Sequence, residues 1–355
     1  MMLSTFVSVL ANHLWQSTVF ALAAGLLALA LKKNQARTRY WIWWIASMKF
    51  MIPFSLLVNL GSYFRWQTAE ALPAKATASV LAIGQVAQPF TSEVVWTIVP
   101  GAAERSSDAM FAFFPALLVA AWFCGCCLML LRWWNKWRRA QAFVWNAETE
   151  RPALMTAGRE FETLRRLEQT SGARRPLDLA ASTAAIEPSV LGLLRPVLVW
   201  PAGLSERLGD DELEAILLHE LAHVRRRDNL TAALHMVVEA VFWFHPLVWW
   251  IGVRLVDARE KACDEDVLRW GGASTVYAEG ILKVCEFCLE SPLGCAAGVT
   301  GSDLKKRIED IVRNRVARRL SLSATLLLVG AAIMVVAGPL VIGAVQVTPR
   351  RVQPE

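Results

Sequence analysis

Residues 217–228 read LLHELAHVRRRD, an HExxH pattern set in an apolar run that favours a helix. Because one turn of α-helix returns side chains four residues apart to the same face, His219 and His223 would project side by side. Two imidazole nitrogens in that arrangement can hold one Zn²⁺. Glu220 would lie next to the ion, where a carboxylate can take a proton from the attacking water and pass it to the leaving amine. The stretch therefore predicts the catalytic helix of a zinc metallopeptidase.

The surrounding sequence supports a helix at this position. An apolar stripe precedes the motif at helical spacing, formed by Leu213, Ile216 and Leu217. Asp210 or Asp211 is expected to cap the first turn, with Glu214 three residues after Asp211 as in a capping box. An HExxH pattern arises by accident in roughly one chain in a hundred of this length, so the interpretation depends on this context.

A third ligand is expected downstream, because a catalytic zinc usually takes three protein ligands and leaves a fourth position for water. The best candidate is Glu260, in the sequence REKACD at residues 259–264, where Glu260 and Asp264 share one helical face. Asp264 and Asp228 are candidates for accepting the free N–H of a ligating imidazole, which would fix its tautomer. Without the upstream motif, Glu260 and Asp264 are explained more simply as an exposed charged face.

Composition points to a membrane protein. Hydrophobic residues make up 55% of the 355-residue chain, and the mean hydropathy is +0.37. Four apolar runs, at residues 5–31, 41–60, 110–131 and 320–345, are long enough to cross a hydrocarbon core about 30 Å thick. The predicted fold is therefore mainly α and integral to the membrane. It has three transmembrane helices within residues 1–132, an α+β zinc domain at residues 133–319 and a fourth transmembrane helix.

The distribution of Lys and Arg predicts the orientation of these spans. Basic residues crowd the loop after the first run and the segment after the third, and they are sparse between residues 61 and 109. The N-terminus and the tail at residues 346–355 are therefore expected outside, and the zinc domain in the cytoplasm. The basic stretch at residues 305–319 also contains acidic residues and precedes a span, so it indicates attraction to anionic lipid headgroups rather than direct nucleic-acid binding.

Two segments beside the motif need a structural interpretation. Residues 193–201 are predicted as a strand, which is either a core strand or an edge to which an extended peptide substrate could add. Residues 237–256 could pass for a further span, but Glu260 would then lie across the bilayer from His219. We expect instead two helices broken at His245 and Pro246, packed at the membrane surface, with the second returning Glu260 to the zinc.

Two further residues are candidates for stabilising the oxyanion of a tetrahedral intermediate. They are His245, at the helix break, and Tyr277, downstream of Glu260. Each of these residue types is more often structural, so the assignment depends on whether the side chain reaches the metal.

Taken together, these motifs resemble the BlaR/MecR-type integral-membrane metallopeptidases over nearly the whole chain. The resemblance rests on the HExxH at His219, on Arg226 and Asp228, on HPLVW at residues 245–249 and on the segment from Glu260 to Asp264. It implies a cytosolic zinc domain of the gluzincin type in a bacterial-type inner membrane. It also implies His219, His223 and Glu260 as ligands and Glu220 as the catalytic base. Residues 192–201 look like the segment that precedes the active helix in that family.

The resemblance has one departure, which bears on the expected function. The antibiotic sensors of that family continue after the last span into an external penicillin-binding domain, whereas about ten residues follow Val345 here, so β-lactam sensing is not expected. The family implies cleavage of a regulatory protein, either the protease itself or a BlaI/MecI-type transcriptional repressor. The alternative is a non-catalytic membrane signal transducer or scaffold with a structural zinc site. The sequence does not indicate the oligomeric state.

Overall fold

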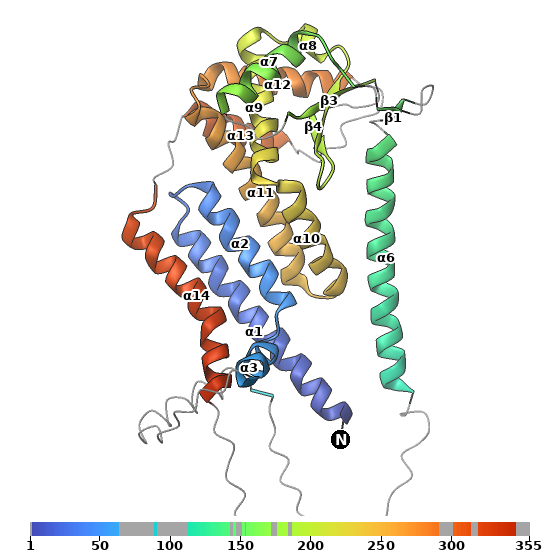
Figure 1. Ribbon diagram of the computed structural model, residues 1–355, viewed down its shortest axis with the longest axis vertical. Helices are drawn as coiled ribbons and strands as arrows, with labels where there is room; N and C mark the ends of the chain where they lie inside the picture. The colour runs from blue at the N-terminus through green and yellow to red at the C-terminus, as the bar shows by residue number, and fades with distance from the viewer. Residues whose placement is uncertain are drawn as a thin grey trace, which may run out of the picture. The chain divides into compact units, whose positions relative to one another are not determined.

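The computed structural model describes residues 2–63, 89–90, 113–142, 145–146, 151–152, 154–171, 176–183, 187–290, 301–313 and 319–345. These residues are mainly helical, with a few short strands (Figure 1). The chain divides into two compact units. The first comprises Met1–Ala30, Ile45–Ala121 and Arg319–Glu355, and the second comprises Leu31–Trp44 and Trp122–Arg318. The second unit contains the HExxH motif.

Apolar helices make up the first unit. It holds α1 (Met2–Ala30), α3 (Phe54–Tyr63), α14 (Leu322–Val345), the end of α2 (Ala36–Met51) and the start of α6 (Phe114–Ala142). Helices α3 and α14 approach closely, because a Cβ on Gly61 would overlap the carbonyl of Leu340. Nε2 of the His13 imidazole donates a hydrogen bond to the Phe50 carbonyl at 2.8 Å, so this polar side chain of α1 has a partner inside the protein.

Three described helices are long and apolar enough to cross a membrane: Val7–Ala30, Phe114–Arg139 and Leu322–Val341. They lie at the first, third and fourth predicted spans. The second predicted span, at residues 41–60, is not a single helix, because α2 and α3 meet at Pro53 with a bend of 72°. Proline lacks the amide proton and disfavours helical geometry at the preceding residue, which accounts for the break. The bent pair counts as a fourth span only if both helices cross as one.

A small mixed sheet lies in the second unit. Strand β5 (Val197–Pro201) pairs in parallel with β3 (Asp178–Ser182) and antiparallel with β4 (Ser189–Leu191), giving the order β3-β5-β4. The predicted strand at residues 193–201 thus corresponds to β5. Both of its edges are paired and its central residues are buried, so β5 is a core strand and the edge-strand interpretation is wrong. A separate pair, β1 (Trp145–Asn146) and β2 (Arg151–Pro152), is antiparallel.

Helices pack against the sheet and form most of the core of this unit. They are α7 (Arg159–Ser171), α8 (Leu204–Arg207), α9 (Asp210–Arg226), α10 (Asp228–Val241), α11 (Pro246–Arg269), α12 (Ser274–Glu290) and α13 (Gly301–Val312). Helix α9 packs against α7, α11 and α12, and α13 packs against α11 and α12. Fully or almost fully buried side chains fill the space between them, including Leu164, Trp200, Leu213, Leu217, Tyr277 and Ile311. The HExxH helix is therefore held in the centre of the unit.

The predicted break between the two helices after the motif is confirmed. Helix α10 ends at Val241, and α11 begins at Pro246 with His245 as its N-cap. Proline is favoured in the first turn of a helix, where its missing N–H would have no partner in any case. The two helices form a hairpin that carries the chain from the end of α9 back to Glu260.

Candidate metal centre

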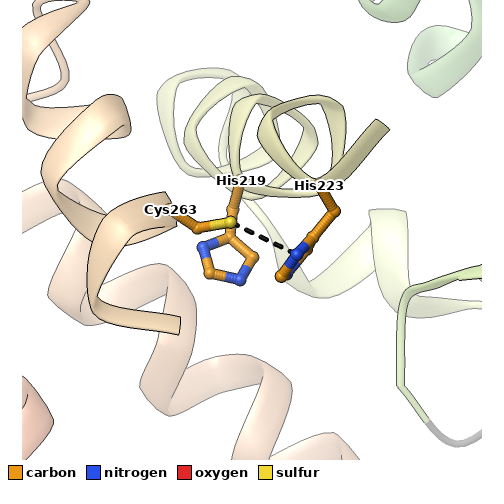
Figure 2. A group of neighbouring side chains, drawn as sticks. All are labelled: His219, His223 and Cys263. Atoms are coloured by element: carbon orange, nitrogen blue, oxygen red, sulfur yellow. Dashed lines mark hydrogen bonds between the residues drawn. The ribbon is translucent and has the colours of Figure 1, made fainter. Parts of the chain in front are cut away.

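Helix α9 places its two histidines on one face. Figure 2 shows His219 and His223 projecting together from this helix, with Cys263 of α11 beside them. The imidazole ring centroids are 4.9 Å apart and the rings are nearly perpendicular, at 84°. His219 and Glu220 are both buried. The spacing of four residues thus gives the geometry that the sequence predicts.

The start of α9 differs from the expected capping pattern. The N-cap is Gly209, and Oε2 of Glu212 accepts the Gly209 N–H at 2.7 Å. Glu214 instead forms a 3.1 Å ion pair with Arg166 at the surface, so the predicted pairing of Asp211 with Glu214 is wrong. The cap lies one or two residues earlier than expected, because the helix begins at Asp210. Three acidic residues in the first turn still complement the helix dipole.

The end of α9 orients His223. Arg227 adopts a left-handed conformation with φ of 55°, and this turn leads directly into α10 at Asp228. The carboxylate Oδ2 of Asp228 lies 2.7 Å from Nδ1 of His223 and also accepts a 2.6 Å hydrogen bond from Arg226. Burial would raise the pKa of Asp228, but the hydrogen bonds from His223 and Arg226 lower it. An ionised Asp228 therefore holds the Nδ1–H of His223 and leaves Nε2 free for a metal.

A second carboxylate orients His219 through a tyrosine. The hydroxyl of Tyr277 donates to Oδ1 of Asp264 at 2.7 Å and lies 2.8 Å from Nδ1 of His219. A hydroxyl has one proton, so Tyr277 accepts a hydrogen bond from the Nδ1–H of His219. This arrangement selects the tautomer whose Nε2 carries a free lone pair. Both histidines therefore present Nε2 as the ligand atom.

Glu260 lies where the two free nitrogens converge. Its Oε2 is 3.5 Å from Nε2 of His219 and 3.9 Å from Nε2 of His223, while Oε1 accepts hydrogen bonds from Arg259. Burial would raise the pKa of Glu260, but the two histidines and Arg259 hold it well below the ordinary value. Ligand atoms about 2.1 Å from a tetrahedral zinc are roughly 3.4 Å apart, so the two distances from Glu260 Oε2 are close to those that one zinc ion would require.

The pKa of Glu220 is shifted in the direction opposite to that of Glu260. Burial raises the pKa of its carboxyl, the adjacent His219 and His223 partly offset this, and Glu260 raises it further. A buried carboxyl with a raised pKa binds a proton more readily at neutral pH than an exposed one. Such a group is suited to accept a proton and then donate it.

Cys263 offers a different third donor. The imidazoles of His219 and His223 and the thiol of Cys263 have potential ligand atoms within 4.8 Å of one another. However, the sulfur lies 3.3 Å from Nδ1 of His223, the nitrogen that Asp228 already engages, as the dashed line in Figure 2 shows. Burial also raises the pKa of the thiol well above its ordinary value, whereas a metal ligand must be a thiolate. The two Nε2 atoms and Glu260 could therefore hold a metal without using the nitrogen that Asp228 engages.

Arg307 of α13 is a residue of this centre that the sequence interpretation missed. Its Nε and Nη2 atoms donate to the two oxygens of Asp264 at 3.0 and 2.7 Å. The same Nη2 lies 3.5 Å from Nε2 of His219. Arg307 and His219 hold the pKa of the buried Asp264 at about 2, although burial alone would raise it. The basic stretch at residues 305–319 was expected to attract lipid headgroups. Arg307 does not take part in this, because its guanidinium is bound to Asp264.

A pattern in the sequence could have identified Arg307. Leu304, Ile308 and Ile311 form the apolar face of α13 that packs into the core. Arg307 lies on that same face, three residues from Leu304 and four from Ile311. A single cation on the buried side of an amphipathic helix requires an acidic partner inside the protein.

Neither proposed oxyanion stabiliser is placed for that role. The Tyr277 hydroxyl is used by Asp264 and by Nδ1 of His219, the nitrogen on the side of the ring away from Glu260. His245 caps the far end of α11, fourteen residues before Glu260 and about 21 Å away along the helix. Tyr277 is thus a positioning residue for His219. His245 lies too far from Glu260 to stabilise an oxyanion at the metal, so its candidacy for that role is wrong.

Glu187, which precedes β4, is a further carboxylate near this centre. Burial raises the pKa of its carboxyl, and the neighbouring carboxylates of Glu220 and Glu260 raise it further. No sequence motif surrounds Glu187, so only the fold brings it close to the two other acids. Its presence makes this side of the centre strongly acidic.

Comparisons with known proteins show which family and which curated proteins the chain is similar to. A model of the BlaR1 peptidase M56 family matches residues 9–311. The methicillin resistance protein mecR1 of Staphylococcus aureus is 32% identical over 112 residues, which is 31% of this chain and 19% of that protein. The regulatory protein BlaR1 of Bacillus licheniformis is 31% identical over 147 residues, which is 40% of this chain and 24% of that protein. The chain thus matches a quarter or less of the length of these curated relatives.

Proposed function

The chain belongs to the BlaR1 peptidase M56 family, and we propose that it is a membrane zinc endopeptidase whose metal is held by His219, His223 and Glu260. The family comprises metal-dependent peptidases, and its relatives BlaR1 and mecR1, together with several apolar helices here, indicate a multi-pass inner-membrane protein. The observation that carries the proposal is the convergence of two oriented Nε2 atoms on one oxygen of Glu260. Two imidazoles and one carboxylate are a donor set typical of catalytic zinc.

The mechanism assigns separate roles to the residues around the ligands. Bound zinc would supply Lewis-acid polarisation of the attacking water and the scissile carbonyl. Glu220 accepts the proton of the water on its carboxylate and delivers it to the leaving amine nitrogen. Asp228 and Asp264, the latter through Tyr277, hold the Nδ1–H of the two histidines so that the ligand nitrogens keep their direction. Arg307 keeps Asp264 ionised.

The substrate we propose is a regulatory protein in the cytosol or next to the membrane. The printed name of the Bacillus licheniformis relative is a regulatory protein. By the sequence resemblance, candidates are the chain itself and a transcriptional repressor of the BlaI/MecI type. The distribution of Lys and Arg supports a cytoplasmic zinc domain and an external N-terminus. The reaction would then link a membrane protein to a cytosolic response.

The competing function is a non-catalytic signal transducer or scaffold in which zinc only stiffens the fold. The observation in its favour is Cys263, which with the two histidines could give a thiolate-containing site of the structural kind. Glu220 weighs against it. A buried carboxyl with a raised pKa beside the ligands costs stability and has no use in a closed structural site.

Removal and return of the metal tests the endopeptidase proposal. The full chain purified in detergent should cleave itself or added β-casein, with fragments followed by mass spectrometry. Treatment with 1,10-phenanthroline should abolish the cleavage, and one equivalent of Zn²⁺ should restore it. Cleavage that continues after the zinc content has fallen to zero would rule out the mechanism.

A further inference from the structure

The hairpin of α10 and α11 has an unusual charge distribution. From residue 229 to residue 253 the sequence contains a single residue of the Asp, Glu, Lys and Arg group, Glu239. Helix α10 has only 14 residues, and the 24-residue α11 is not among the described helices that are apolar enough to cross a membrane. Neither helix contributes a candidate metal ligand before Glu260. The hairpin therefore needs an explanation of its own.

The polar side chains of the hairpin face inwards. Oε1 of Glu239 lies 3.2 Å from Nε2 of His235, one turn earlier in α10. A Cβ on Gly252 of α11 would lie 2.7 Å from Glu239 Oε1 and 2.8 Å from His235 Nε2. The His235–Glu239 pair is thus packed between the two helices, against the one position where α11 has no side chain.

Some apolar side chains of the hairpin are buried, such as Val248 and Ile251, but a second set faces outwards. Val253 is 67% exposed, and the other exposed large hydrophobic residues of the two helices and their turn are Leu234, Val237, Phe244, Trp249 and Val256. A helical hairpin in water would place these apolar side chains inside and the polar His235–Glu239 pair outside. The observed arrangement is that of a segment surrounded by hydrocarbon.

The turn between α10 and α11 contacts α6, and the point of contact along α6 indicates how deep in the bilayer the hairpin would reach. The indole Nε1 of Trp122 donates to the Val241 carbonyl at 2.9 Å, and the indole of Trp243 donates to the Trp122 carbonyl at 3.3 Å. A Cβ on Gly125 would overlap the Trp243 ring, so α6 packs directly on the turn. Trp122 lies inside the candidate span Phe114–Arg139, about 12 Å from its first residue and 25 Å from its last.

We propose that α10 and α11 form a re-entrant hairpin inserted in the bilayer, with lipid acyl chains covering its exposed apolar face. The charged residues that flank the inserted part lie at matching heights. Arg132 of α6 is about 15 Å along its helix from Trp122, and Arg254 and Asp257 are about 12 and 16 Å along α11 from Pro246. Both helices thus leave the hydrocarbon at the same level.

The insertion also defines where the metal centre works. Glu260 is about 21 Å along α11 from Pro246, which is roughly one helical turn above Asp257. The metal centre then lies at the level of the lipid headgroups. If the chain is the endopeptidase proposed above, a metal centre at this level favours substrates whose scissile bond is held close to the membrane surface.

Labelling of single positions in lipid nanodiscs tests the insertion without any assay of peptide hydrolysis. The full chain carries Phe244→Cys, Val253→Cys or Asp257→Cys, and Leu289→Cys is the control because Leu289 is an exposed apolar residue of α12 in the same unit. A water-soluble maleimide is applied, and modification of each introduced thiol is read from its own peptide by mass spectrometry. Parallel discs contain a phosphatidylcholine with a diazirine on its acyl chain.

The expected result is a boundary between Val253 and Asp257, which lie on one face of α11. Variants at 244 and 253 should react at least tenfold more slowly than the variants at 257 and 289, and acyl-chain adducts should map to residues 241–253. Equal reaction at 253 and 289 would overturn the proposal. Protection at 253 without acyl-chain adducts would also overturn it, by assigning the apolar face to a second copy of the chain.

Discussion

Glu220→Gln should lower peptide-bond cleavage by about 10²–10⁴-fold while leaving the zinc content unchanged, because it removes a general base and keeps the shape of the side chain. Glutamine cannot accept the proton of the attacking water, and the two histidines and Glu260 remain in place. The measurement compares fragments of cellular and membrane proteins in cells that express the wild type or the variant, with zinc determined on the purified proteins.

Glu214→Gln is the matched control for this substitution. Glu214 lies on the same helix, but its carboxylate pairs with Arg166 at the surface, 3.1 Å away. Cleavage by this variant should equal that of the wild type. Equal zinc and identical fragment patterns in wild type and Glu220→Gln would contradict the endopeptidase proposal and support the transducer.

Asp264→Ala should strongly destabilise the fold, because it leaves the inward-facing guanidinium of Arg307 without its carboxylate partner. Removing one member of a fully buried ion pair costs about 3–5 kcal/mol, and because the Arg307 side chain is 27% exposed we expect the lower end of that range. The same change removes the acceptor for the Tyr277 hydroxyl. For a unit of this size the apparent melting temperature should fall by on the order of 10 °C, measured by tryptophan fluorescence in detergent on the metal-free protein.

The control for this prediction is Glu214→Ala, which breaks an ion pair whose side chains are 63% and 41% exposed. Exposed pairs contribute about 0–1 kcal/mol, so its melting temperature should stay within a few degrees of the wild type. If both variants melt together with the wild type, Asp264 and Arg307 do not form the buried pair that the structure shows.

Local spacing predicts the part of the centre that lies on single helices. Four residues separate His219 from His223, and the structure has their rings side by side on α9. Asp228 was a candidate because it follows the motif closely, and the left-handed turn at Arg227 brings it to His223. A helical period and a short turn are enough for such predictions, since both depend on neighbouring residues alone.

Contacts between distant segments account for what the sequence did not predict. Arg307 reaches Asp264 from a helix 43 residues later, and nothing in the basic stretch distinguishes it except its place on the apolar face. The sequence makes Tyr277 a candidate for stabilising the oxyanion, because it does not show which nitrogen of His219 the hydroxyl contacts. In the structure the hydroxyl contacts Nδ1 and orients the ring. The bend at Pro53 was overlooked because a hydropathy run averages over a single proline.

The most direct test of the central claim is the zinc content of purified wild type, Glu260→Gln and Cys263→Ala, measured by mass spectrometry of the metal after dialysis against a weak chelator. The account predicts one zinc per chain in the wild type and in Cys263→Ala, and little or none in Glu260→Gln. Zinc retained by Glu260→Gln and lost from Cys263→Ala would contradict it and place the metal on the sulfur side of His223.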